Sequence, residues 1–175
     1  MLPTTKRVKR TKSAQQALIS LMRLCSRAER SSGEAKRLMA TWEVPLQDRA
    51  GVLQRLKAER FIDDERYAMA FVREKVNLNG WGEHKIRSAL RRKGIAEDII
   101  ARAIKEISPE QSTQRLVERL ERKLKTVKYS SIYDLKNKLI RHGIALGFSM
   151  DTILPHVEQL TRDIKTDEQC DEFIY

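Results

Sequence analysis

The feature that most restricts the fold of this chain is a repeated helix end. Lys85-Ile86 leads to Lys93-Gly94-Ile95 in the same way that Lys138-Leu139 leads to Leu146-Gly147-Phe148. After each turn the pattern continues, with Asp98, Ile100 and Ile104 matching Asp151, Ile153 and Val157. A period of about fifty residues is typical of repeat proteins, in which each unit buries its apolar face against its neighbours. We therefore expect tandem copies of one small unit.

A weaker first copy has Trp42-Glu43-Val44 at the turn, with Leu38 and Met39 before it and Leu53 and Leu56 after it. Gly94 and Gly147 stand where a helix can end in a left-handed residue, a conformation that costs glycine little. Glu43 would cost about 1 kcal/mol or more in that conformation, and Pro45 follows it. The sequence therefore predicts a different geometry for the first turn.

Capping signals indicate where helices begin. Ser13 with Gln16, Ser31 with Glu34 and Ser108 with Gln111 have the capping-box spacing, and Pro109 suits a first helical position. Asp63 is expected to cap the following helix, which begins with Asp64 and Glu65. A metal site there is disfavoured, because consecutive helical side chains point about 100° apart. Further helices are expected over residues 83–93, 96–107, 109–127, 131–146 and 149–164.

Composition agrees with a small helical protein. Among 175 residues there are only 7 Gly and 4 Pro, aromatic residues make up 6%, and no long strand-like alternation occurs. The expected fold class is all-α, an elongated array of three tandem three-helix repeats. We expect a basic flexible arm over 1–12, repeats over 13–60, 61–107 and 108–165, and an acidic tail over 166–175. The tail either folds against the basic surface or frays.

Missing motifs argue against several function classes. The sequence has no phosphate-binding loop, dinucleotide-binding glycine motif or HExxH motif, and its three histidines lie on separate predicted helices. Cys25 and Cys170 are far apart, so we expect no disulfide or zinc, and Cys25 is interpreted as a buried thiol. We expect no catalytic residue, metal or cofactor. No apolar segment has the length of a membrane span or secretory core, so a cytoplasmic protein without membrane contact is expected.

Positive charge is the main functional signal. The chain has 35 Lys and Arg against 24 Asp and Glu, a net charge of +11, and residues 85–93 contain five cations and no acid. Such a face is either a solvated helix surface or a surface for phosphates or an acidic partner. Nearby Trp81 is either a core anchor or a platform for base stacking. The helix over 109–127 is a weaker candidate, because Glu118 and Glu121 can pair with its cations.

The predicted central contact surface consists of Arg66, Arg73, Lys75, Lys85, Arg87, Arg91, Arg92 and Lys93. The predicted flexible electrostatic supplement in the arm consists of Lys6, Arg7, Lys9, Arg10 and Lys12. Clustered Lys and Arg attract polyanions at long range, which is why these residue types point to nucleic acid or an acidic protein.

One segment carries a family resemblance. It comprises Phe61-Ile62-Asp63-Asp64-Glu65-Arg66-Tyr67-Ala68, Phe71-Val72-Arg73, Lys75, Trp81-Gly82, Lys85-Ile86-Arg87, Leu90 and Lys93-Gly94-Ile95. This pattern resembles the signature of RecX regulatory proteins, and the helical repeats extend the resemblance over about residues 13–165. The resemblance implies an all-helical modulator of the bacterial recombinase RecA that is not an enzyme.

Members of that family are thought to lie in the groove of the RecA filament on single-stranded DNA and to inhibit ATP hydrolysis, strand exchange and coprotease activity. The resemblance therefore implies a role in DNA repair, recombination and the SOS response. The expected partners are the RecA filament and single-stranded DNA, with duplex DNA as a further possibility, for a monomeric protein. The alternative is a nucleic-acid-binding module similar to helix-turn-helix proteins, with the helix over 83–93 inserted into DNA and no recombinase partner.

Overall fold

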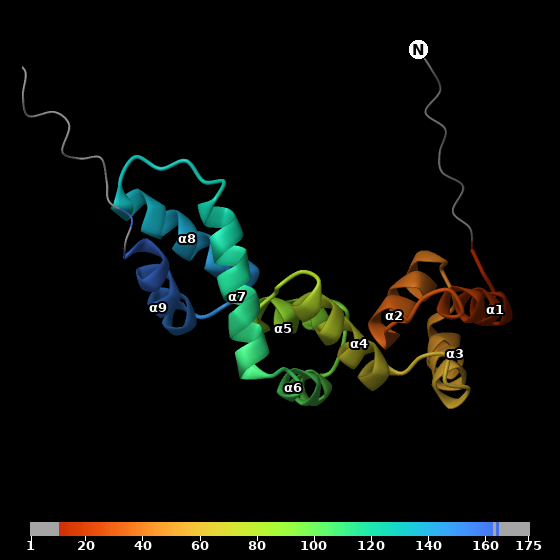
Figure 1. Cartoon of the computed structure of the whole chain (residues 1–175). Coiled ribbons are helices and arrows are strands. Elements are labelled where there is room, and N and C mark those ends of the chain that lie inside the picture. Colours follow the sequence, from red (N-terminus) through yellow and green to blue (C-terminus); the bar gives the residue numbers. More distant parts are fainter. Residues whose placement is uncertain (1–10, 163, 165–175) are drawn as a thin grey trace, which may run out of the picture. The chain divides into compact units, whose positions relative to one another are not determined.

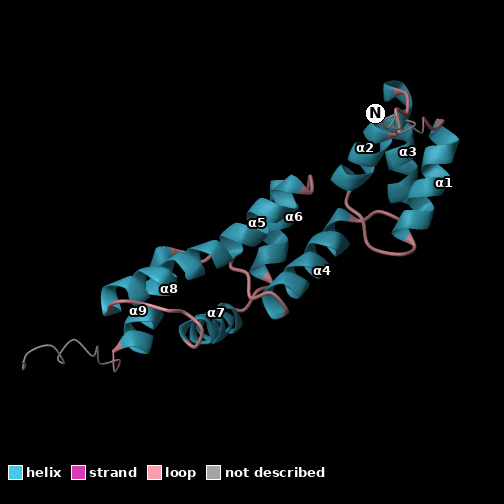
Figure 2. Ribbon diagram, turned by 90° about the horizontal axis from the view of Figure 1, so that it is seen from above, coloured by secondary structure: helices cyan, strands magenta, loops and turns pink. Residues whose placement is uncertain are grey.

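A computed structural model describes residues 11–162 and 164, in which every regular element is a helix (Figures 1 and 2). The helices are α1 (Ala14–Cys25), α2 (Ser32–Thr41), α3 (Leu46–Ala58), α4 (Asp64–Asn77), α5 (Glu83–Arg92), α6 (Glu97–Lys105), α7 (Pro109–Leu124), α8 (Ile132–Leu146) and α9 (Met150–Thr161). The predicted all-helical class with tandem three-helix repeats is confirmed. Within the described residues, none of these helices has the length and apolarity needed to cross a bilayer.

The described residues form two compact units. Among the described residues, unit 1 contains 11–70 and 90–101, and unit 2 contains 71–89, 102–162 and 164. Helices α4, α5 and α6 each have residues in both units. The middle set of three helices is therefore divided between the units.

Each unit contains a core of interlocking apolar side chains. In unit 1, α1 and α2 both pack on α3, and Leu21, Met39 and Leu56 are completely buried. Cys25 packs at the edge of this core and is half-buried, and burial raises the pKa of its thiol. In unit 2, α7, α8 and α9 pack on one another around a core that includes Leu120 and Leu139.

The predicted helix starts are largely confirmed. Ser13 and Ser31 each form a complete capping box, and Asp63 Oδ1 accepts hydrogen bonds from the backbone N–H groups of Glu65 and Arg66 at 3.0 and 2.9 Å. Ser108 caps α7, but the Gln111 amide donates to Asn77 Oδ1 at 2.8 Å instead of returning to the cap. That glutamine therefore joins α7 to the end of α4 within unit 2.

In the part of the chain that the structure describes, four helices end in the same hydrogen-bonded turn around a left-handed residue. These residues are Glu43, Arg60, Gly94 and Gly147, with φ angles of 52°, 56°, 76° and 93°. In each turn the next N–H bonds back to the carbonyl five residues earlier, as in Ile95 to Leu90 at 3.2 Å and Phe148 to Gly143 at 3.2 Å. This is the Schellman motif, and an apolar residue follows each left-handed position. The predictions for Gly94 and Gly147 are confirmed.

The prediction for Glu43 is wrong, because this residue adopts the left-handed conformation in spite of its side chain. The N–H groups of Glu43 and Val44 bond to the carbonyls of Ala40 and Met39, both at 3.0 Å. Val44 is buried in the core of unit 1. Two backbone hydrogen bonds and the burial of one apolar side chain outweigh a conformational cost of about 1 kcal/mol.

Replacing Glu43 with glycine should therefore stabilise the chain. The side chain is exposed, so its loss removes steric strain at small cost in packing, and we expect a gain of about 0.5–1 kcal/mol in the free energy of unfolding. Urea unfolding followed by far-UV circular dichroism measures this change. A loss of stability would mean that the left-handed turn does not form.

Three of these turns receive the start of an earlier helix. In unit 1, Ser31 Oγ donates to the Lys93 carbonyl at 2.7 Å beside Gly94. In unit 2, the Gly82 N–H donates to the Leu146 carbonyl at 2.8 Å beside Gly147. The first turn is occupied in the same way, since the Lys12 N–H donates to the Trp42 carbonyl at 2.9 Å. The repeat in the sequence thus corresponds to a repeated contact with the carbonyl that precedes the left-handed residue.

Candidate nucleic-acid and partner interface

The predicted contact residues are distributed over both units. Arg66, Arg91, Arg92 and Lys93 belong to unit 1, and Arg73, Lys75, Lys85 and Arg87 belong to unit 2. Lys12 belongs to unit 1, where its ammonium lies 3.6 Å from the centroid of the Trp42 ring and donates to Ser20 Oγ. Lys6, Arg7, Lys9 and Arg10 and the predicted acidic tail lie outside the described residues.

Arg66 is held by a carboxylate of its own unit. Its guanidinium donates to both oxygens of Glu29, at 2.7 and 3.1 Å, and to the Arg60 carbonyl at 3.3 Å. The hydrogen bond with Glu29 raises the pKa of Arg66. A bidentate pair of this kind fixes the geometry of both side chains. Arg66 therefore links the start of α4 to the segment between α1 and α2.

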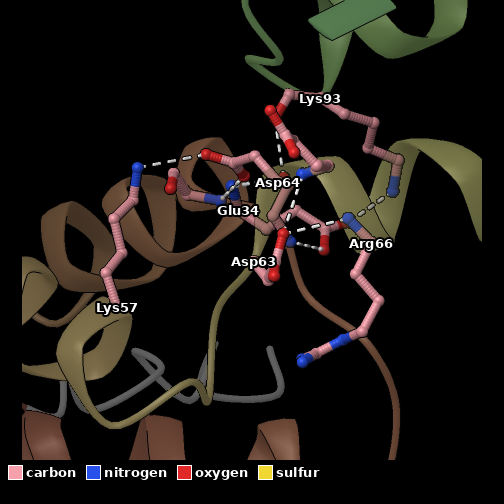
Figure 3. Close-up of polar contacts among 9 residues, drawn as sticks. Glu34, Lys57, Asp63, Asp64, Arg66 and Lys93 are labelled. Atoms are coloured by element: carbon pink, nitrogen blue, oxygen red, sulfur yellow. Dashed lines mark hydrogen bonds and ion pairs between the residues drawn. The ribbon is translucent and has the colours of Figure 1, made fainter. Parts of the chain in front are cut away.

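Lys93 is held in a similar way, by Glu34 of α2 (Figure 3). Its ammonium forms an ion pair with Glu34, whose side chain is only 13% exposed. This hydrogen bond raises the pKa of Lys93, and the Tyr67 hydroxyl also bonds to the same ammonium. Burial raises the pKa of Tyr67, so the phenol stays protonated. Lys93 is thus part of the packing of unit 1.

The acidic run at the start of α4 is also structural. Asp63 caps α4, whereas Asp64 accepts a hydrogen bond from the Ser32 N–H at 2.8 Å and forms an ion pair with Lys57 at 3.3 Å (Figure 3). The two carboxylates therefore stabilise two different helix starts. The interpretation of Asp63 as a helix cap is confirmed.

The cations of α5 are partly balanced by nearby carboxylates. Arg87 forms an ion pair with Glu83 one turn earlier, and Arg91 forms one with Glu97, both at 2.8 Å. The sequence stretch without acids is thus not a surface without acids. Arg91 and Glu97 are both exposed, and an ion pair of that kind contributes only about 0–1 kcal/mol. The Glu97 carboxylate is therefore a weak competitor for a phosphate at Arg91.

Trp81 lies within a cluster of rings and cations in unit 2. It packs edge-on against Phe71, with ring centroids 6.3 Å apart. The Lys75 and Lys85 ammonium groups lie 5.5 and 4.7 Å from the Trp81 centroid. Cations at this distance from an indole ring are attracted by its π electrons. The arrangement favours the interpretation of Trp81 as an anchor that positions the two lysines.

A second group of cations lies in unit 2, on the helix that the sequence indicates as a weaker binding candidate. Arg119 and Lys123 lie one turn apart on α7. Their charges, together with that of Lys85, act on the imidazole of His142 of α8. Burial, followed by the charges of Lys123, Arg119 and Lys85, lowers the pKa of His142. The spacing of four residues on α7 could have shown that Arg119 and Lys123 share a face. Their proximity to Lys85 depends on tertiary packing.

Comparisons with known proteins agree with the predicted resemblance. Residues 63–104 match the family described as RecX, second three-helix domain. The chain is 30% identical to Regulatory protein RecX of Bacillus cytotoxicus and 29% identical to that of Bacillus mycoides, over 92% of this chain and 59% of each relative. It thus spans about three fifths of the length of these relatives.

Solved structures support the fold. A crystal structure of regulatory protein RecX superposes with a TM-score of 0.76 at 22% identity, covering 86% of this chain and 73% of the other. The structure of RecX from Lactobacillus salivarius gives a TM-score of 0.74 at 20% identity, covering 84% of this chain and 96% of the other. The resemblance predicted from the segment around Asp63 agrees with the match of residues 63–104 to the RecX second three-helix domain.

Proposed function

We propose that this member of the RecX family binds the filament that RecA forms on single-stranded DNA and inhibits its ATP hydrolysis, strand exchange and coprotease activity. The observation that carries this proposal is the similarity to Regulatory protein RecX over 92% of the chain. The protein acts by binding and not by catalysis, as a monomer, in the cytoplasm where RecA and DNA are found. Its cellular role is the modulation of DNA repair and recombination.

The proposed interface consists of the predicted central cations other than Arg66 and Lys93. These are Arg73, Lys75, Lys85, Arg87, Arg91 and Arg92. Arg66 and Lys93 are better explained as internal links, because Glu29 and Glu34 already occupy their donors. The interface cations would contact DNA phosphates or acidic side chains of RecA.

Several weak contacts on one chain can produce strong binding. Once one contact has formed, the other contacts of the same chain form at a high effective concentration, so their affinities reinforce one another. A protein bound simultaneously to neighbouring RecA subunits would oppose the changes in filament geometry that accompany ATP hydrolysis. This mechanism requires no catalytic group on the inhibitor.

The proposal predicts inhibition of DNA-dependent ATP hydrolysis by RecA at doses too low to coat the DNA. Replacing both Arg87 and Arg91 with glutamate should raise the concentration needed for half-inhibition about tenfold or more, because losing 1.4 kcal/mol across two charge contacts weakens binding tenfold. Steady-state ATPase titrations measure the effect, and circular dichroism checks that the helices are retained.

A variant with Arg23 and Arg27 replaced by glutamate is the matched control. Both residues are exposed, lie at or after the end of α1 and change the net charge equally. This control should inhibit as the unaltered protein does. Equal losses in both variants would contradict the α5 interface. Tight binding to duplex DNA without ATPase inhibition at low dose would instead favour a nucleic-acid-binding module that has no recombinase partner.

A further inference from the structure

Unit 2 contains a concentration of positive charge that its packing does not require. The charges of Lys85 of α5 and of Arg119 and Lys123 of α7 all act on the imidazole of His142 of α8, and the Lys85 ammonium reaches α8 at Ala145, three residues after His142. Within the described residues, no carboxylate forms an ion pair with Arg119 or Lys123, and the Lys85 ammonium donates to the Ala145 carbonyl at 2.8 Å. Like charges at short range oppose folding unless an anion balances them.

The surrounding structure holds two of these cations, Arg119 and Lys85, in place. An ideal Cβ at Gly80 would lie 2.9 Å from Arg119 Cγ, so the aliphatic stem of Arg119 lies directly against the backbone of Gly80. Lys85 is fixed by the Ala145 carbonyl and by the ring of Trp81. All four side chains are half-buried. A site built from constrained cations loses less side-chain entropy when it binds a ligand.

We propose that Lys85, Arg119, Lys123 and His142 form a binding site for the phosphodiester backbone of a single nucleic-acid strand. Arg119 and Lys123 are separated by about 6 Å along the axis of α7, which is similar to the spacing of successive phosphates on an extended strand. Guanidinium and ammonium groups bind phosphate oxygens through charge-assisted hydrogen bonds. The site deepens the proposed function by assigning DNA contact to α7 and α8 of unit 2.

The lowered pKa of His142 gives this site a second property that can be measured, the pH dependence of binding. The cations facing the imidazole are Lys123 and Arg119 from α7 and Lys85 from α5; α9 also packs on α8, but its described residues add no charge to the imidazole. A bound phosphate would offset these cations and raise the pKa of His142. Binding should therefore take up a proton, and affinity should increase as the pH falls through and below about 6.5.

The test uses fluorescence anisotropy of a labelled oligothymidylate with the full chain and without RecA, so that it is independent of the proposed inhibition. Replacing Arg119 and Lys123 with glutamine should reduce the slope of log affinity against log salt by about 1.4, or about 0.7 for each lost phosphate contact. The control replaces Arg122 and Lys125 with glutamine in the same way. These two cations are exposed and lie on or just after the same helix. Their loss should leave the slope within about 0.3 of its original value. His142→Gln should remove the increase in affinity at low pH.

Two results would overturn the proposal. Equal slope changes in both double variants would mean that only net charge matters. Unchanged DNA binding together with lost inhibition of RecA would mean that this surface contacts the protein of the filament and not its DNA. If only charge reversal at Arg87 and Arg91 abolished inhibition of RecA, the assignment of α5 to the filament would be supported. If the salt slope of DNA binding fell only in the Arg119 and Lys123 variant, the assignment of α7 to DNA would be supported independently. Thermal melting verifies that each variant is folded.

Discussion

Replacing Gly82 with alanine should lower the free energy of unfolding of unit 2 by about 3 kcal/mol. An ideal Cβ at this position would lie 2.4 Å from the Gly147 carbonyl oxygen, 2.6 Å from its carbon and 2.8 Å from the Phe148 nitrogen. All three atoms are backbone, so no side chain can rotate away to make room. The start of α5 would have to move away from the end of α8.

That movement would break two backbone hydrogen bonds. The Gly82 N–H donates to the Leu146 carbonyl at 2.8 Å, and the His84 N–H donates to the Gly147 carbonyl at 3.1 Å. Overpacking costs about 1–3 kcal/mol and each lost hydrogen bond about 0.5–1.5 kcal/mol, so the combined effect is a large fraction of the stability of a small domain. Urea unfolding followed by far-UV circular dichroism measures the loss.

Gly51→Ala is the matched control. Gly51 is exposed in the interior of α3, and an added Cβ would meet nothing within 4 Å. This substitution should raise stability by about 0.5–1 kcal/mol, because alanine favours a helix interior over glycine. If Gly82→Ala were as harmless as Gly51→Ala, the close contact between α5 and α8 would not exist in solution.

The sequence contained enough information to predict the helices and the repeat. Capping serines and the left-handed glycines are local signals, because a hydroxyl reaches only three residues ahead and a turn involves about six. Predicted and observed helices differ by no more than three residues at their ends, as for α7, expected over 109–127 and observed to end at Leu124. Glu43 was mispredicted because its conformational cost is local, whereas the burial of Val44 that offsets it is tertiary.

The candidate interface could be predicted only in part. Counting charges identified Arg66 and Lys93, but their partners Glu29 and Glu34 lie 37 and 59 positions away. No spacing rule connects residues at such separations. The same limitation concealed the basic site of unit 2, since Arg119 and Lys123 follow Lys85 by more than thirty residues. A cation's role depends on what the fold places beside it.

Lys93→Met should lower the stability of unit 1 by about 1–3 kcal/mol, in contrast to the neutral effect expected for a residue that only binds a ligand. The substitution leaves the Glu34 carboxylate, which is 13% exposed, without the ammonium that balances it. It also removes a hydrogen-bond partner of Tyr67, a residue that is itself buried. Unpaired polar groups in such positions cost about 1–3 kcal/mol, and the partial exposure of Lys93 places the effect below that of a fully buried pair.

Lys36→Met is the control, because Lys36 is exposed on the same helix as Glu34, and its loss should change stability by less than about 0.5 kcal/mol. Combining Lys93→Met with Glu34→Gln should recover part of the loss, since the second change removes the unbalanced charge. A coupling energy of at least about 0.5 kcal/mol in this double-mutant cycle would confirm the link. Additive effects would show that the two side chains do not interact in solution. The double variant also separates the effect of Lys93 on folding from its effect on binding. If this variant were folded and yet failed to bind single-stranded DNA, Lys93 would belong to the contact surface, as the sequence predicts.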